Sequence, residues 1–153
     1  MDGSVKTGDK ISWDEVEKPF RYEFKLDPSD KFAFHDALLP KEKDRVVKTT
    51  GAHFNYTDGF KSDGYLMGDG VCHLASLMYW VAKDAGLTAL APRNHDFAII
   101  PQISREYGVA IYYNPNSLGT SGFQNLYITN NKEKPVTFTF DYKENDLTIS
   151  VLE

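Results

Sequence analysis

The sequence GVCHLASLMYWVAKDAG occupies residues 70–86 and contains the clearest helical pattern in the chain. Its apolar residues recur at intervals of three and four, which places them on one face of an α-helix. Gly70 permits a tight turn into this helix, and Gly86 stands where helices commonly end in a left-handed residue. The pattern predicts a helix over residues 71–85. The predicted buried face consists of Leu74, Leu77, Met78, Val81 and Ala85.

Short strands are predicted on both sides of this helix. Residues 21–26 alternate, with Tyr22, Phe24 and Leu26 on one face, as in a half-buried strand. Residues 136–142 also alternate, and residues 147–152 return after a turn at Asn145-Asp146, which predicts an antiparallel hairpin. Further strands are predicted over residues 32–34, 97–100, 109–113 and 125–129.

These elements predict an α+β fold in which one buried central helix packs on a mostly antiparallel β-sheet with long loops. Residues 49–70 are rich in Gly, Asp, Asn and Tyr, and they predict a long loop just before the helix. Long ordered loops are frequently functional. Residues 1–20 are polar and are interpreted as an arm or linker, which leaves residues 21–153 as one domain.

Composition excludes several classes of function. The net charge is −5 and no basic stripe is visible, which argues against nucleic-acid binding. The single cysteine excludes an internal disulfide and a cysteine-cluster metal site. No apolar run approaches the roughly 20 residues that span a bilayer, and the first residues lack the apolar core of a secretion signal. We expect no cofactor, no metal and no membrane segment in this sequence.

Cys72 is the candidate nucleophile. On a helical wheel it lies opposite the predicted buried face, in the first turn, after a glycine-rich loop. A thiol at a helix N-terminus meets unpaired N–H groups and the positive end of the helix dipole, which both favour the nucleophilic thiolate. The same N–H groups are suited to stabilise an oxyanion. The alternative is a buried, inert thiol.

A nucleophilic cysteine needs a base, usually a histidine. His95 opens a predicted strand downstream of the helix, which is a workable position for that base. His73 is adjacent to Cys72 but points elsewhere on the helix, while His35 and His53 lie in loop-like stretches. A metal site built from these last three histidines lacks a ligand-spaced pair.

The run Gly68-Asp69-Gly70-Val71-Cys72-His73 and the helix after it resemble the central motif of the VanW family. There a glycine cluster precedes Gly-Val-Cys-Gln, a Ser or Thr pair and Leu-Tyr. The resemblance covers roughly residues 25–152, and His73 replaces the family's Gln. The further matching segments are Phe32 to Asp36 with Pro40, Ala85-Gly86-Leu87, Arg93 to Asp96, Ile100-Pro101, Arg105-Glu106, Asn125-Leu126 and the final hairpin.

The resemblance implies an extracytoplasmic protein that acts on the stem peptides of peptidoglycan as an L,D-transpeptidase. It implies that Cys72 attacks the carbonyl preceding a terminal D-Ala, that His95 is the base, and that Glu106 or Asp96 orients the imidazole. A neighbouring stem amine then resolves the thioester. The residues expected to contact substrate or the oxyanion are Gly70, Val71, His73, Ser76, Arg93 and Asp96.

Two other functions stay open from the sequence. A cysteine peptidase or amidase of peptidoglycan has the same order of cysteine helix and histidine strand, and differs in using water as acceptor. A non-catalytic cell-wall-binding module requires only the fold, and it predicts a thiol indifferent to alkylation.

Overall fold

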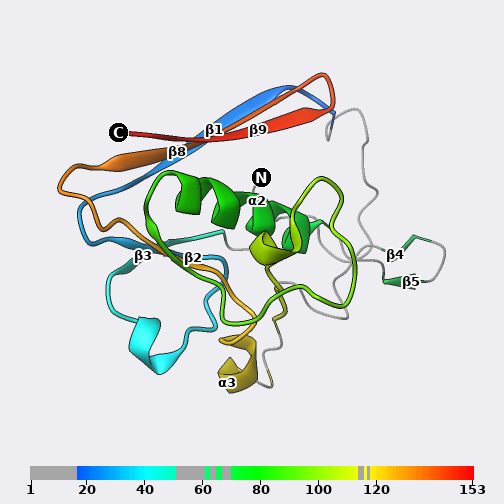
Figure 1. Ribbon diagram of the computed structural model, residues 1–153, viewed down its shortest axis with the longest axis horizontal. Coiled ribbons are helices and arrows are strands. Elements are labelled where there is room, and N and C mark those ends of the chain that lie inside the picture. The colour runs from blue at the N-terminus through cyan, green and yellow to red at the C-terminus, as the bar shows by residue number, and fades with distance from the viewer. Residues whose placement is uncertain (1–16, 51–60, 63–64, 67–69, 114–115, 117) are drawn as a thin grey trace.

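The computed structural model describes residues 17–50, 61–62, 65–66, 70–113, 116 and 118–153. The predicted helix is present as α2 (Val71–Asp84), which lies at the centre of the described part of the chain (Figure 1). Gly70 and Gly86 have φ values of 80° and 72°, in the left-handed region that favours glycine. The N–H of Gly86 donates to Lys83 and that of Leu87 to Ala82, so the helix ends in a Schellman motif.

The longest strands form an antiparallel sheet, with β8 (Val136–Lys143) between β1 (Phe20–Leu26) and β9 (Asp146–Leu152). The alternating residues pair as their pattern predicts: Phe24 lies opposite Phe138. The predicted hairpin is confirmed, but its turn is Glu144-Asn145, one residue earlier than predicted. Both turn residues have positive φ, which suits the right-handed twist of the paired strands.

A second sheet has the strand order β3-β2-β7-β6 within the described residues. Strands β2 and β3 are parallel, whereas β2–β7 and β7–β6 are antiparallel, so pairing is mostly antiparallel as predicted. Strands β3 and β6 were not predicted. The bounds are β2 (Lys31–Ala33), β3 (Val46–Thr49), β6 (Thr88–Leu90) and β7 (Tyr127–Thr129). The other elements are η1 (Pro40–Glu42), β4 (Lys61–Ser62), β5 (Tyr65–Leu66), η2 (Arg105–Tyr107) and α3 (Leu118–Ser121).

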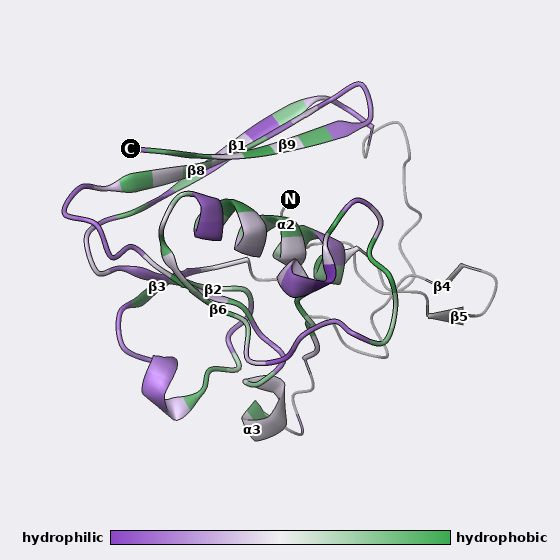
Figure 2. Cartoon of the chain, in the orientation of Figure 1, coloured by the Kyte–Doolittle hydropathy of each residue, from purple (hydrophilic) through white to green (hydrophobic). Residues whose placement is uncertain are grey.

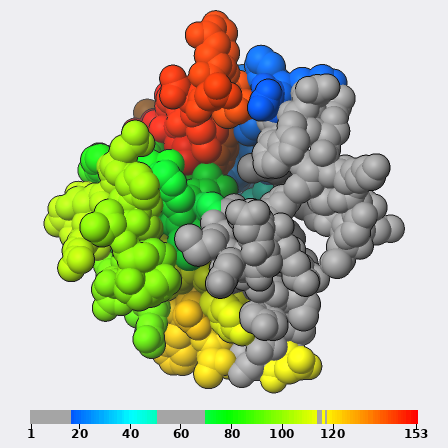
Figure 3. Space-filling view, turned by 90° about the vertical axis from the view of Figure 1, so that its right-hand side faces the viewer, coloured from blue at the N-terminus to red at the C-terminus, as the bar shows by residue number. Residues whose placement is uncertain are grey.

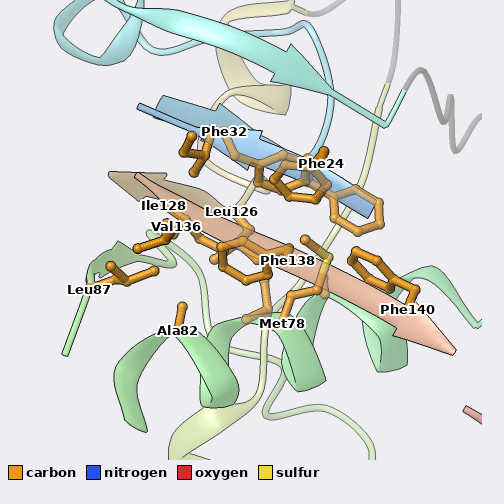
Figure 4. Close-up of a cluster of buried hydrophobic side chains, with 14 of the residues drawn as sticks. Phe24, Phe32, Met78, Ala82, Leu87, Leu126, Ile128, Val136, Phe138 and Phe140 are labelled. Carbon is orange, nitrogen blue, oxygen red and sulfur yellow. The ribbon is translucent and has the colours of Figure 1, made fainter. Parts of the chain in front are cut away.

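The core lies between α2 and the two sheets (Figure 4). Phe24 stacks on Phe138 within the first sheet and on Phe32 of β2, in each case with ring centroids 5.1 Å apart. Phe24 therefore joins the two sheets through one aromatic stack. Offset-stacked rings at this separation contribute about 0.5–1.5 kcal/mol beyond the burial of their area.

The predicted buried face of α2 is wrong in its centre. The buried residues are Ala75, Ser76, Met78 and Ala82, while Leu77 and Val81 are only partly buried. Ala75 and Ala82 both belong to the core cluster, and Figure 4 shows Ala82 on the side of α2 that faces the sheet. Small side chains at these positions let the helix axis approach the aromatic rings of the core. Leucines at that interface would hold the helix farther away.

The strands predicted over residues 97–100 and 109–113 are also wrong. Residues 97–100 belong to a loop in which Phe97 and Ile99 are 73% and 78% exposed. Figure 2 shows this loop as a hydrophobic stretch between β6 and η2, and in Figure 3 it forms a protruding yellow-green lobe. Residues 109–111 are buried, and their N–H groups alternate between α2 and Arg93, as in an extended chain. They belong to no strand, because these partners lie outside any strand ladder.

Candidate active site

Cys72 is the second residue of α2. The N-cap of the helix is Gly70, which has no side chain with which to cap the first turn. Because α2 is 14 residues long, it has a full helix dipole with its positive end at this turn. The sequence prediction of a thiol at a helix N-terminus is therefore confirmed in its position.

The orientation predicted for Cys72 is wrong. Since the buried face of α2 is centred on Ala75, Met78 and Ala82, Cys72 lies at the border of that face rather than opposite it. Its side chain is partly buried and packs against the core. The sulfur is nevertheless not enclosed by aliphatic groups alone, because it meets the main chain of Ile111.

The thiol and Ile111 make two contacts. The N–H of Ile111 donates to Sγ of Cys72 at 3.4 Å, and the carbonyl of Ile111 lies 3.7 Å from Sγ, within reach of the S–H. The N–H contact is made with either form of the sulfur, whereas the carbonyl contact requires the protonated thiol. Ionisation would therefore keep the N–H donor and lose the S–H donation.

Ser76 lies one turn after Cys72 and is completely buried. Its hydroxyl donates to the carbonyl of Cys72 at 2.7 Å and accepts the N–H of Val109 at 2.9 Å. Ser76 is therefore committed to main-chain groups in this structure. Its expected contact with substrate stays a prediction that this arrangement does not favour.

Residues 108–111 separate α2 from the segment that contains His95. Ala110 donates its N–H to the carbonyl of Arg93, and the N–H of His95 donates to the carbonyl of Gly108. In an extended chain successive N–H groups point to opposite sides. Segment 93–95 is thus on one side of residues 108–111, and Cys72 is on the other.

The His95 ring is half-buried and oriented by its own loop. Its Nδ1 lies 3.1 Å from the carbonyl of Ala98, and the ring packs on Phe97 at a centroid distance of 4.0 Å. A carbonyl only accepts, so Nδ1 carries a proton and Nε2 is the basic nitrogen of the neutral ring. The ring borders a pocket of about 20 Å³, enough for one water but not for a peptide side chain.

The expected third member does not contact His95 in this structure. Glu106 is exposed in η2, and its carboxylate accepts a hydrogen bond from the Ser104 hydroxyl at 3.2 Å. Asp96 is exposed in the loop. The group that orients His95 is the Ala98 carbonyl, which sequence reasoning missed because a main-chain acceptor has no residue-specific signal.

The other predicted residues lie at the border of the same region. His73 is half-buried on α2, and Arg93 is exposed next to the 108–111 segment. Next to that segment, Tyr107 stacks on Trp80 of α2 at 5.2 Å, which holds η2 against the helix. Burial raises the pKa of Tyr107 above its ordinary value, and the charges of Glu106 and Asp84 add to this effect.

Two histidines considered in the sequence lie elsewhere. His35 is buried, with Nε2 2.9 Å from the carbonyl of Gln124. His53 lies outside the described residues, as do Gly68 and Asp69 of the glycine cluster. Within the part of the chain that the structure describes, no group of three or more His, Cys, Asp or Glu residues is arranged to bind a metal ion. In the same residues, no helix has the length and apolar character needed to cross a bilayer.

The family model described as "VanW like protein" matches residues 23–152. The chain therefore belongs to the VanW family, as its motifs predicted, and the match includes Cys72 and His95. Proteins of this family are associated with the cell wall and with vancomycin resistance. Comparison with curated proteins and with solved structures finds no match.

Proposed function

We propose that this chain is an extracytoplasmic enzyme that uses Cys72 for acyl transfer on peptidoglycan stem peptides, as an L,D-transpeptidase. The observation that supports the proposal best is the position of the Cys72 sulfur. It lies in the first turn of α2, where it accepts the N–H of Ile111 and is only partly buried. Both features favour a thiolate that a substrate can reach.

In the proposed reaction the thiolate attacks the carbonyl that precedes the terminal D-Ala of a stem tetrapeptide. The tetrahedral oxyanion is held by main-chain N–H groups at the start of α2, near Gly70 and Val71. The amide bond breaks, D-Ala leaves as an amine after gaining a proton, and a thioester remains. The side-chain amine of a neighbouring stem then attacks the thioester and releases the thiolate.

His95 is the proposed proton carrier. Its Nδ1 is bound to the Ala98 carbonyl, which leaves Nε2 to accept a proton, and its segment is hydrogen-bonded to the 108–111 segment that also contacts Cys72. Proton exchange with the sulfur requires the loop of residues 95–99 to move, or a water to connect the two. Glu106 and Asp96 are proposed to stabilise the imidazolium through their charge, and Arg93 and His73 to contact the stem peptide.

One observation favours a second candidate, a non-catalytic wall-binding module. The contact of Cys72 with Ile111 has the same form as that of Ser76 with Val109, which joins two completely buried residues. On this view Cys72 secures the extended segment and has no chemical role. The two candidates differ in the reactivity of the thiol.

The products of a single incubation separate these functions. Purified protein is mixed with a disaccharide tetrapeptide, and the products are identified by mass spectrometry, with Cys72→Ser as the matched control. Cross-linked dimer that requires Cys72 supports transpeptidation. A shortened monomer alone supports the peptidase. Unchanged substrate, together with binding to isolated cell walls in a separate sedimentation assay, supports the binding module.

A further inference from the structure

Ser76 and Cys72 contact one extended segment in the same way. They are one helical turn apart on α2, and they accept the N–H groups of Val109 and Ile111 at 2.9 and 3.4 Å. Four residues of a helix advance about 6 Å, and two residues of an extended chain advance about 6.6 Å. The spacing from Cys72 to Ser76 on α2 therefore matches the spacing from Ile111 to Val109. The register of the segment at Ser76 therefore sets the position of Ile111 at the sulfur.

Ser76 is fixed more firmly than Cys72. Its side chain has no exposed area, and its proton is committed to the Cys72 carbonyl at 2.7 Å, so a lone pair of its oxygen faces Val109. Val109 is likewise completely buried. Two buried groups with one good hydrogen bond form a rigid anchor, because breaking that bond would leave a buried N–H unsatisfied.

We propose that Ser76 is a positioning residue for Cys72, which holds the 109–111 segment so that the Ile111 N–H is directed at the sulfur. This inference rests on the proposed role of Cys72 as nucleophile. Ser76 acts through the main chain and does not touch substrate. Its role is to keep a hydrogen-bond donor on the thiolate when the S–H is lost.

The variant Ser76→Ala removes the acceptor for the Val109 N–H. The segment keeps its bond from Ala110 to the Arg93 carbonyl, so it stays attached while its register at Ile111 loosens. Among the described residues, the titratable side chains adjacent in sequence to Cys72 and Ile111, the two residues that meet at the sulfur, are His73 and Tyr112. The substitution leaves both in place.

The test is the rate of iodoacetamide alkylation of Cys72 as a function of pH. For Ser76→Ala we expect the midpoint to move to higher pH and the rate below the midpoint to fall about tenfold, as expected for loss of one hydrogen bond to a charged group. Ser76→Thr keeps the hydroxyl and should restore most of the rate. Ala75→Gly, a buried change on the same turn, should destabilise the helix and leave the midpoint unchanged.

The outcomes separate this inference from the function on which it rests. Wild-type Cys72 that reacts no faster than a small free thiol near neutral pH contradicts the proposed function. A reactive wild-type thiol whose profile is identical in Ser76→Ala contradicts only the role of Ser76.

Nuclear magnetic resonance of the wild-type protein provides a second test that needs no variant. The Ile111 amide resonance should titrate with the same midpoint as alkylation, and more strongly than that of Val109. An Ile111 amide that does not respond to ionisation of Cys72 overturns the inference.

Discussion

The buried side chain of Asn125 makes four hydrogen bonds to main-chain groups, so replacing it should strongly destabilise the fold. Its Oδ1 accepts the N–H groups of His35 at 3.2 Å and Leu126 at 2.8 Å. Its Nδ2 donates to the carbonyls of His35 at 3.0 Å and Ala37 at 3.1 Å. The side chain has no exposed area, so water cannot replace these four bonds without entering the core.

The expected loss for Asn125→Ala follows from these contacts. Each hydrogen bond contributes about 0.5–1.5 kcal/mol net, and a buried group left without a partner costs about 1–3 kcal/mol. Two N–H groups and two carbonyls each lose one hydrogen bond, and the four net contributions give a total of roughly 2–6 kcal/mol. That loss is a large part of the 5–15 kcal/mol typical of a domain.

Urea unfolding followed by circular dichroism measures this loss. The control is Asn131→Ala, the same chemical change at an exposed asparagine that accepts one N–H bond, from Thr88 at 3.1 Å. We expect the control to lose less than about 1 kcal/mol. Asn125→Asp keeps the two acceptor bonds but turns a carboxylate toward two carbonyls, so it should not restore stability. A loss in Asn125→Ala as small as that of the control would refute the reasoning.

Three further outcomes follow from the contacts. Cys72→Ser keeps an acceptor for the Ile111 N–H, so we expect a stability loss below about 1 kcal/mol but no alkylation and no acyl transfer, whereas Cys72→Ala should unfold at lower urea. For Gly108→Ala, whose added Cβ would lie 3.1 Å from the His95 carbonyl, we expect a loss of about 1–3 kcal/mol in a urea titration, because the backbone there must shift. Burial raises the pKa of Tyr127 in the folded protein. The stability that the neutral hydroxyl contributes is therefore complete below about pH 10 and is lost as the pH rises through the higher folded-state pKa. Over that rise in pH, the difference in unfolding free energy between wild type and Tyr127→Phe should narrow.

The sequence predicted those parts of the fold that local patterns specify. The helix α2, its two glycine ends and the β8–β9 hairpin depend on spacings within a few residues, and all are present. The strands β3 and β6 were missed because each has only three or four residues and depends on pairing with a distant segment.

Two errors have a common physical cause. Residues 97–100 have the β-branched and aromatic composition of a strand, but composition does not specify a strand to pair with. In the structure these residues form a loop, in which Phe97 and Ile99 are exposed. Residues 109–111 are extended as predicted for a strand, but their N–H groups bind Ser76, Arg93 and Cys72. Local propensity describes the conformation of a segment and not the partner that satisfies its main chain.

The candidate site divides in the same way. The position of Cys72 at the start of a helix followed from the sequence, because a capping glycine and a helical period surround it. Its contact with Ile111 and the contact of His95 with Ala98 are made with main-chain groups, which have the same chemistry at nearly every residue. No residue pattern indicates such partners, so only the fold reveals them.

The acyl-enzyme itself tests the central claim most directly. Wild-type protein is mixed with a stem tetrapeptide whose side-chain amine is acetylated, so that no acceptor amine is present. The reaction is quenched in acid, and the intact mass of the protein and the mass of its Cys72 peptide are measured. We predict a tripeptidyl adduct confined to Cys72 and accompanied by one released D-Ala per adduct. The central claim would be contradicted if D-Ala were released while Cys72 stays unmodified and Cys72→Ser keeps the activity. It would also be contradicted if no D-Ala were released under any condition that preserves the fold.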